Sequence, residues 1–264
     1  MTRISIITPT YNAVKFIAEC VENVAAQSVA GLEHIVMDGG SRDGTVEELE
    51  RLATVHPHLR FVSEPDRGQS DAMNKGVARA SADVIGFLNV DDYYEPGAIG
   101  EALAYLDQDP SLTMIVGTCR VINEDGSTDH WNRPHDLRPE ALMLGWMYFQ
   151  FPCNPSAYIY RKSVHDAIEY NVGDHYAMDF DFILAVAMQS KMRFVDRHWG
   201  NFRMLPGTKT FEDRANGHAR TTAIIDKYKA RLAPHRRAYM RALRMRIRTR
   251  WALGRNLRWA GLKR

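Results

Sequence analysis

Residues 83–92 read DVIGFLNVDD, an apolar run that ends in two adjacent carboxylates, Asp91 and Asp92. The run predicts a buried strand. Ligands bind at the carboxyl ends of strands in open α/β sheets, and hard divalent cations prefer oxygen ligands. The pair therefore indicates a candidate cation site at the end of this strand. A solvated turn also accommodates two Asp residues, so the pair alone leaves an ordinary turn as an alternative.

Strands and helices alternate around this stretch through residue 107. Short apolar strands are expected from residue 4, stopped by a turn at Pro9, and at residues 33–37. Helices are expected at about residues 14–27, from a cap at Asp43 or Thr45, and at residues 70–80. This α/β alternation with short loops predicts a mixed, mainly parallel sheet flanked by helices.

The pattern changes after Gly97. Strands are expected at residues 114–117, 119–122 and 157–160, a hairpin turn at residues 124–126, and a buried helix at residues 178–191. Residues 130–155 are rich in Trp, Tyr, Phe, Pro and His, and we expect them to be irregular and close to the site. No repeat or clear domain boundary precedes the C-terminal tail.

Three further motifs precede the carboxylate pair in a fixed order. They read ISIITPTYN at residues 4–12, DGGSRDGT at residues 38–45 and EPDRGQSDAMNKG at residues 64–76. This order resembles the family 2 glycosyltransferases, which are inverting enzymes with the GT-A fold that use nucleotide-sugar donors. The resemblance covers roughly residues 2–210. Four linked motifs make it far more specific than a single glycine motif.

The resemblance implies how a donor is bound. The family residue that matches Asp38 accepts a hydrogen bond from a nucleobase N–H, and residues matching Pro9 and Tyr11 line the base. An ordinary turn at residues 38–40 beside a packing Tyr11 is the plain alternative. Arg67 and Lys75 are expected to add positive charge near the phosphates, unless they belong to a solvated helix face. The complete donor set is Thr8, Pro9, Tyr11, Asp38, Arg67, Asn74, Lys75, Asn89 and Asp91.

The carboxylate pair matches the acidic metal motif of the family. By position, Asp92 is expected to ligate a divalent cation, and Asp91 to contact the cation, its bound water or the ribose. The expected cofactor is Mn²⁺ or Mg²⁺, because both suit oxygen ligands and donor phosphates. Such a cation absorbs the negative charge of the leaving diphosphate as a Lewis acid.

Inverting transfer also needs a carboxylate that takes the proton of the acceptor hydroxyl. Residues 176–184 read YAMDFDFIL and place Asp179 and Asp181 at the start of an apolar helix. Asp179 aligns with the family's catalytic base, although Met178 replaces the usual Glu. Acidic residues at a helix N-terminus are also favoured by the helix dipole, and Asp181 fits that structural explanation well.

One departure from the family pattern concerns the segment that follows the base. Many relatives carry a His there that helps to hold the metal or the phosphates, and this chain has Leu205 at that position. The departure puts a protein ligand from this loop in doubt. Arg203, Thr208 or Lys209 are the candidates to serve the phosphates instead. His198 and His218 are expected to be structural or surface residues.

The charge of the chain is divided unevenly. From Lys227 onward there are 14 Lys or Arg and no Asp or Glu, whereas the preceding residues hold 20 Lys or Arg and 32 Asp or Glu. We therefore expect a GT-A domain at residues 1–226 and a basic amphipathic helical tail at residues 227–264. The tail places Tyr239, Leu243, Ile247 and Trp251 four residues apart.

Such a tail with Trp is typical of attachment to an anionic membrane surface. Packing of the stripe on the acidic body, and nucleic-acid binding without a recognisable fold for it, are the alternatives. No run approaches the roughly 20 apolar residues of a membrane span, and no signal-peptide core is expected at the N-terminus. Three cysteines, Cys20, Cys119 and Cys153, show no metal-ligand spacing and indicate reduced thiols.

These features predict a metal-dependent, inverting glycosyltransferase at the cytosolic face of the cell membrane. Its expected donor is a UDP-, GDP- or dTDP-sugar, and its expected acceptor is a glycan or a lipid-linked hydroxyl in cell-surface polysaccharide or glycolipid synthesis, with no nucleic-acid partner. A sugar nucleotidyltransferase is the enzyme alternative, but the residues after the first strand, Thr8 to Asn12, lack its glycine-rich basic loop. A non-catalytic, basic-tailed membrane-binding protein is the other alternative.

Overall fold

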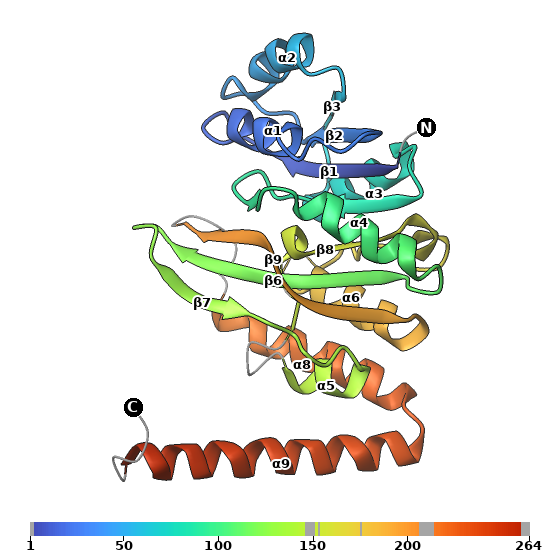
Figure 1. Ribbon diagram of the computed structural model, residues 1–264, viewed down its shortest axis with the longest axis vertical. Coiled ribbons are helices and arrows are strands. Elements are labelled where there is room, and N and C mark those ends of the chain that lie inside the picture. Colours follow the sequence, from blue (N-terminus) through green and yellow to red (C-terminus); the bar gives the residue numbers. More distant parts are fainter. Residues whose placement is uncertain (1–2, 146–150, 153, 175, 206–213, 260–264) are drawn as a thin grey trace.

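The computed structural model contains one mixed sheet with helices packed on both of its faces (Figure 1). The structure describes residues 3–145, 151–152, 154–174, 176–205 and 214–259. The strands are β1 (Ile4–Thr10), β2 (Leu32–Asp38), β3 (Leu59–Ser63), β4 (Val84–Phe87), β5 (Tyr93–Tyr94), β6 (Met114–Asn123), β7 (Thr128–Asn132), β8 (Tyr158–Arg161) and β9 (Met192–Met204). The helices are α1 (Ile17–Ala25), α2 (Thr45–Val55), α3 (Gln69–Arg79), α4 (Ala98–Gln108), α5 (Pro139–Gly145), α6 (Met178–Gln189), α8 (Arg214–Arg231) and α9 (Pro234–Trp259), with the 3-10 turns η2 (Pro155–Ala157) and η3 (Lys162–Asp166).

The strand order is β3-β2-β1-β4-β8-β6-β9-β5, and β7 pairs with β6 beside this path. β1 pairs in parallel with both β2 and β4, and β2 pairs in parallel with β3. β8 then runs antiparallel to β4 and to β6, while β6 and β9 are parallel. The mixed sheet is confirmed, with parallel pairing dominant in its first half. The carboxyl ends of β1, β2, β3 and β4 consequently meet at one edge.

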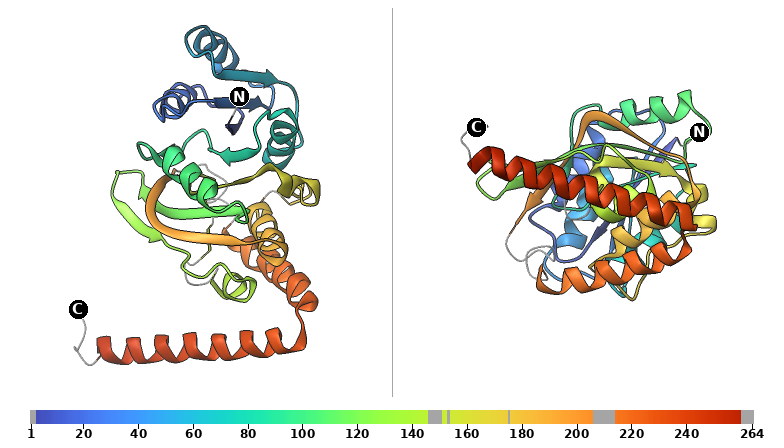
Figure 2. Two further views of the ribbon diagram at one scale, coloured as in Figure 1. Left: turned by 45° about the vertical axis from the view of Figure 1, so that its right-hand side comes forward. Right: turned by 90° about the horizontal axis from the view of Figure 1, so that it is seen from below.

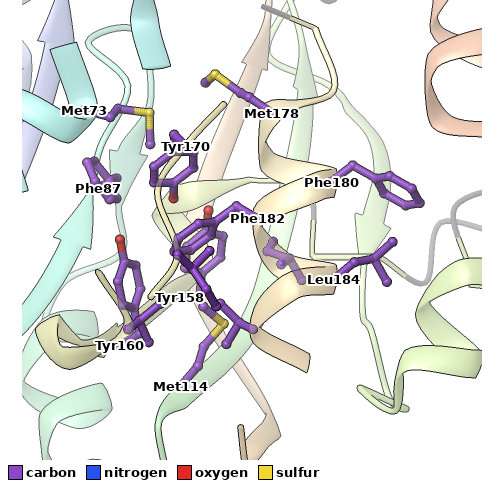
Figure 3. Packing of buried hydrophobic residues seen from close by; sticks show 14 of the residues in the cluster. Met73, Phe87, Met114, Tyr158, Tyr160, Tyr170, Met178, Phe180, Phe182 and Leu184 are labelled. Carbon is purple, nitrogen blue, oxygen red and sulfur yellow. The ribbon is translucent and has the colours of Figure 1, made fainter. Parts of the chain in front are cut away.

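Successive residues of the central strand serve opposite faces of the sheet. Ile6 packs into the cluster beneath α1 and α4, whereas Ile7 packs into the cluster beneath α3 and α6. Side chains alternate across a strand, so an apolar strand with helices on both sides buries every residue. Figure 3 shows part of the second cluster, in which Tyr170 lies between Phe87 and Phe182, with ring centroids 5.5 and 4.1 Å away.

Four details differ from the expectation. β1 continues through Pro9 to Thr10, because β4 pairs with β1 only as far as Ile7, so no partner on that side needs the missing N–H of the proline. Residues 114–123 form a single strand with a shifted register near Thr118. The supposedly irregular stretch of residues 130–155 contains the end of β7 and helix α5. β9 was not predicted. The hairpin turn at residues 124–126 is confirmed.

The two C-terminal helices differ in how they contact the body. α8 packs against α6 and contributes Ile224 and Tyr228 to the main core, and Leu232, just after α8, belongs to the same core. Residue 227 therefore lies inside a helix that is part of the packed body. α9 forms the lower edge of the molecule beside α5 (Figures 1 and 2). Among the described residues, no helix is both long and apolar enough to span a bilayer. The division at residue 227 stays a prediction.

The contacts of α9 with described side chains lie in its first half. Arg236 donates to the carboxylate of Glu140 in α5, which is 2% exposed, with N–O distances of 2.5 and 3.0 Å. Met240 is buried, and Tyr239 lies under the guanidinium of Arg138 at 5.1 Å. Tyr239 remains 41% exposed and Met245 67% exposed. The start of α9 is therefore a docked helix.

Candidate active site

A cavity of about 500 Å³ opens at the carboxyl ends of the parallel strands. It is lined by Pro9, Thr10, Tyr11, Gly39, Asp66, Gly68, Gln69, Ala72 and Val90. β1 and β2 end at this cavity, the β3–α3 loop forms a second wall, and the first turn of α3 a third. Tyr11 is 65% exposed, which is unusual for a large aromatic side chain beside a cavity. Of the predicted donor residues, Pro9 and Tyr11 line the cavity.

The carboxylate pair follows β4 at the same edge of the sheet. Asp92 is 2% exposed, and its oxygens are held by three donors. The backbone N–H of Arg203 donates to Oδ1 at 3.0 Å, while the amides of Asn89 and Asn154 donate to Oδ2 at 2.9 and 3.1 Å. The Asn89 amide oxygen in turn accepts from Gln69 at 3.0 Å, which links the pair to the cavity wall.

The environment of the pair suits a cation. Burial, followed by repulsion from Asp91, raises the pKa of Asp92, and burial also raises the pKa of Asp91. Two buried carboxylates that resist ionisation together are stabilised when a positive ion joins them. Within the described residues, no group of three or more His, Cys, Asp or Glu side chains converges. The carboxylate oxygens of Asp91 and Asp92 are hard ligands of the kind that Mg²⁺ and Mn²⁺ prefer, so these two residues fit such a cation.

Asp38 ends β2 but does not line the cavity. Its carboxylate is 1% exposed and accepts hydrogen bonds from the backbone N–H groups of Gly40 and Ser41 at 3.0 and 2.9 Å, from the Ser63 hydroxyl at 2.6 Å, and from the Ser41 hydroxyl. These contacts fix the turn after β2. Base recognition by Asp38 stays a prediction. The Asp38 carboxylate already stabilises the turn after β2 through its hydrogen bonds.

Four other predicted donor residues are engaged away from the cavity lining. Thr8 is buried, and its hydroxyl shares a hydrogen bond with His34 Nε2 at 3.0 Å. The side-chain amide of Asn74 donates to the backbone carbonyl of Tyr170 and accepts from its backbone N–H. Arg67 pairs with Asp71 at 3.0 Å, and Lys75 contacts Glu64 and Asp71, each at 3.3 Å. Their donor roles stay predictions.

Asp179 and Asp181 occupy different environments on α6. Asp179 lies in the first turn of α6, and after burial its charge is the next cause of the raised pKa of Tyr158 in the core. Met178, the residue before it, accepts a 2.8 Å contact from the Ser70 hydroxyl of α3. This contact brings the start of α6 to the start of α3, whose neighbouring residue Gln69 lines the cavity.

Asp181 is held by α8. Lys227 Nζ lies 2.8 and 2.9 Å from its two oxygens, and the Tyr228 hydroxyl donates to Oδ1 at 2.6 Å. The turn before α6 is instead fixed by Asp174, which accepts from the backbone N–H groups of Tyr176 and Ala177 at 3.0 Å each. Asp181 therefore attaches α8 to α6, and it also lies in the first turn of α6, where the helix dipole favours an acidic residue.

The end of β9 supplies one described cation near the pair, Arg203. Arg203 donates both guanidinium nitrogens to Glu19 of α1, and its guanidinium lies 5.0 Å from the centre of the Tyr93 ring. Leu205, which takes the place of the family's His, is partly buried. Thr208 and Lys209 lie outside the described residues, as does the side chain of His218. His198 shares a hydrogen bond with Asn201 at 3.2 Å, which agrees with a structural role.

Sequence reasoning missed Asn154 and Asp66. Asn154 reaches Asp92 from a segment 62 positions away in the chain, and only the aromatic and proline-rich composition of residues 130–155 indicated that this region lies near the site. Asp66 was visible within the motif EPDRG, but no role was assigned to it. Cys20 is a buried free thiol whose pKa is raised to about 12 by burial, as expected for an unreactive cysteine.

Comparison with known proteins places these features in context. The sequence profile of Glycosyl transferase family 2 matches residues 5–169. Chondroitin synthase of Pasteurella multocida is 29% identical over 211 residues, which is 78% of this chain and 21% of that protein. The chain thus spans about a fifth of the length of the first curated relatives it matches.

Two solved structures show the fold. Residues 1–349 of S. aureus TarS in complex with UDP-GlcNAc superpose with a TM-score of 0.64 at 20% identity, over 80% of this chain and 61% of that one. The mannosyltransferase PcManGT from Pyrobaculum calidifontis, in complex with GDP-Man and Mn²⁺, gives a TM-score of 0.64 at 20% identity, over 90% of this chain and 69% of that one. The architecture of this chain is the GT-A fold.

Proposed function

Because the chain belongs to Glycosyl transferase family 2, we propose that it transfers a sugar from a nucleoside diphosphate to an acceptor hydroxyl. The observation that carries the proposal is the cavity beside Tyr11 at the carboxyl ends of β1 and β2, next to the partly buried Asp91 and the buried Asp92. An exposed aromatic ring accepts a stacked base, and a carboxylate pair with a cation accepts a diphosphate. The two features lie at one edge of the sheet, as one extended ligand requires.

Different residues of the chain bind the base and the diphosphate of the donor. Tyr11 and Pro9 offer an apolar surface to the base, and Asn89 connects the cavity wall to Asp92 through its two hydrogen bonds. Asp92 and Asp91 would hold Mn²⁺ or Mg²⁺. When bound, this cation stabilises the charge that develops on the leaving diphosphate. The Asn154 amide and the Arg203 backbone N–H keep the Asp92 carboxylate in one orientation.

We assign proton transfer to Asp179. Its carboxylate accepts the proton of the acceptor hydroxyl while that oxygen attacks the anomeric carbon from the face opposite the diphosphate, so the configuration at that carbon inverts. The C–O bond to the diphosphate breaks as the new C–O bond forms. The support for this role is the position of Asp179 at the first turn of α6, which Met178 connects to α3 beside the cavity.

The acceptor class we propose is a glycan or a lipid-linked saccharide in cell-surface polysaccharide or glycolipid synthesis. Relatives named chondroitin synthase in Pasteurella multocida and Escherichia coli support a polysaccharide product. We also propose that the second half of α9 attaches the enzyme to the anionic cytosolic face of a membrane. The 14 basic residues from Lys227 onward, without an acidic one, support attachment at about 1 kcal/mol for each residue that reaches the surface.

Thermal unfolding with candidate ligands tests the proposal. UDP, GDP and dTDP would each be added with and without Mn²⁺, and Mn²⁺ alone would serve as the control. A nucleotide at 100 times its Kd stabilises the native state by about 2.7 kcal/mol, which raises Tm by about 5–10 °C for a protein of this size. We expect such a rise for one nucleoside diphosphate together with Mn²⁺. No rise with any of the three would contradict the proposed function.

A further inference from the structure

We propose that Asp66, and not Asp38, selects the nucleobase of the donor, and that the base it selects is a uracil-type pyrimidine with a single N3–H. The inference rests on the proposed function, because it assigns the base end of the same nucleotide site. The family resemblance implies Asp38 for this contact, whereas the hydrogen bonds of Asp38 and the position of Asp66 favour Asp66.

The first observation is that the Asp38 carboxylate is turned away from the cavity. It is 1% exposed, is absent from the cavity lining, and accepts four hydrogen bonds from the turn after β2 and from Ser63 of β3. If the Asp38 carboxylate turned to reach a base, these hydrogen bonds would break and the turn after β2 would unfold. A carboxylate that already faces the cavity therefore contributes more to the binding affinity of a nucleotide than one that must first rearrange.

The second observation is that Asp66 provides such a carboxylate. Asp66 lines the cavity, and its Oδ1 accepts the backbone N–H of Gly68 at 2.7 Å. Its Oδ2 points toward Gly39: a Cβ atom built on Gly39 would lie 2.8 Å from this oxygen and 3.3 Å from the Tyr11 ring. Any larger residue at position 39 would displace the carboxylate. The hydrogen bond to Gly68 fixes Asp66, and Gly39 leaves room for Oδ2 beside the exposed Tyr11 ring.

The third step is the chemistry of the base. An ionised carboxylate only accepts hydrogen bonds, so it favours a base whose ring nitrogen carries a hydrogen at the pairing edge. Uracil, thymine and guanine carry one, whereas cytosine and adenine present an unprotonated nitrogen there. Guanine presents two adjacent N–H groups and is best matched by both carboxylate oxygens. Oδ1 lies on the Gly68 N–H, and Oδ2 is the oxygen that faces Gly39 and the cavity. A single oxygen directed at the cavity matches the single N3–H of a uracil-type base better than the paired N–H groups of guanine.

The test compares Asp66→Asn with the wild type. In this variant the Asn oxygen keeps the Gly68 hydrogen bond, so the amide nitrogen takes the place of Oδ2. That nitrogen donates, opposes the N3–H of uracil and matches the free N3 of cytosine. Gly39→Ala is a second variant, because its Cβ meets Oδ2 at 2.8 Å. Gly100→Ala in α4 is the matched control, since its Cβ comes no nearer than 3.9 Å to Val29.

Isothermal titration with UDP, CDP and GDP in the presence of Mn²⁺ gives the affinities. All three share the diphosphate, so the ratio of two affinities reports the base alone. We expect wild type and Gly100→Ala to prefer UDP over both CDP and GDP. We expect Asp66→Asn to lower the UDP-to-CDP affinity ratio by about 10- to 100-fold, the range for a hydrogen bond to a charged group. Gly39→Ala should weaken UDP binding.

Failure of the inference can be told apart from failure of the proposed function. If UDP binds with Mn²⁺ and Asp66→Asn keeps the wild-type UDP-to-CDP ratio, Asp66 does not select the base, although the protein still binds a nucleotide. A wild-type preference for GDP over UDP would overturn the assignment to a uracil-type base in the same way. If the wild type binds none of these three nucleotides and does not bind dTDP either, the proposed function fails together with the inference.

Discussion

Asp179→Asn is the substitution that separates catalysis from donor binding. It replaces a carboxylate by an amide of almost the same volume at the first turn of α6, so packing against α3 through Met178 is retained. The amide cannot accept the proton of the acceptor hydroxyl. We therefore expect transfer to fail while the nucleotide still binds.

The magnitude follows from the role assigned to the carboxylate. Removal of a general base lowers the rate by about 10²- to 10⁴-fold. Each factor of ten corresponds to about 1.36 kcal/mol, so the barrier rises by about 2.7–5.4 kcal/mol. The UDP affinity is expected to change by less than about threefold, which is under 1 kcal/mol, because the base contacts the acceptor and not the nucleotide.

Asp181→Asn is the matched control on the same helix. Asp181 is bound to Lys227 and Tyr228 of α8, and the Lys227 side chain is 44% exposed. Loss of the charge in this partly exposed pair is expected to lower the free energy of unfolding by about 1 kcal/mol. That change corresponds to a decrease in Tm of about 2–4 °C. Its turnover should remain within about tenfold of wild type, since it lies outside the reacting groups.

The assay measures UDP release from a panel of UDP-sugars, with water or a saccharide mixture as acceptor, and UDP affinity by titration calorimetry. The expected pattern is an inactive Asp179→Asn that binds UDP normally and an active Asp181→Asn with a lower Tm. If Asp181→Asn is the inactive variant and Asp179→Asn turns over at the wild-type rate, the assignment of the base is refuted.

Three further predictions test other parts of the molecule. Asp92→Asn removes one of two charges at the cation site, so calorimetry should show at least a tenfold loss of Mn²⁺-dependent UDP affinity; unchanged affinity would mean that Asp92 does not hold the cation. Gly200→Ala places a Cβ 2.2 Å from the Ser156 hydroxyl and 2.6 Å from its backbone, and should destabilise the fold by about 1–3 kcal/mol in chemical unfolding, whereas an unchanged stability would be inconsistent with this packing. Removal of residues 247–264 keeps the Arg236–Glu140 ion pair and buried Met240, so Tm should hold while binding to phosphatidylserine vesicles in low salt is lost; vesicle binding equal to that of the full chain would exclude α9 as the attachment site.

The first half of the sheet could be predicted because local signals coincide there. Apolar strands that end in polar motifs alternate with amphipathic helices, and right-handed crossovers leave few possible arrangements. The run that ends in Asp91 and Asp92 was therefore placed correctly at the carboxyl edge. The resemblance then indicated which side chains to inspect.

The second half was harder, because its order depends on contacts between distant residues. β9 carries charged residues among its apolar ones, and its strand conformation follows from pairing with β6, which is some 80 positions earlier in the chain. Asn154 and Asp92 are far apart in the sequence, and only the folding of the chain brings their side chains into hydrogen-bond contact. A sequence pattern describes one segment at a time and contains no direct signal for such partners.

The roles of individual carboxylates were the least predictable feature of the site. Asp38, Asp66, Asp179 and Asp181 all lie near the ends of strands or helices, where polar residues serve turns as readily as ligands. Hydrogen-bond partners distinguish them: Asp38 holds a turn, Asp181 holds α8, and Asp66 keeps one oxygen toward the cavity.

A crystal structure determined with UDP and Mn²⁺ would locate the nucleotide and the cation together. We expect a uracil ring against Tyr11 in the cavity bounded by Gly39 and Asp66, and a diphosphate joined to Asp92 through the cation. A nucleotide bound elsewhere on the protein, or a cation bound without contact to Asp91 or Asp92, would contradict this expectation.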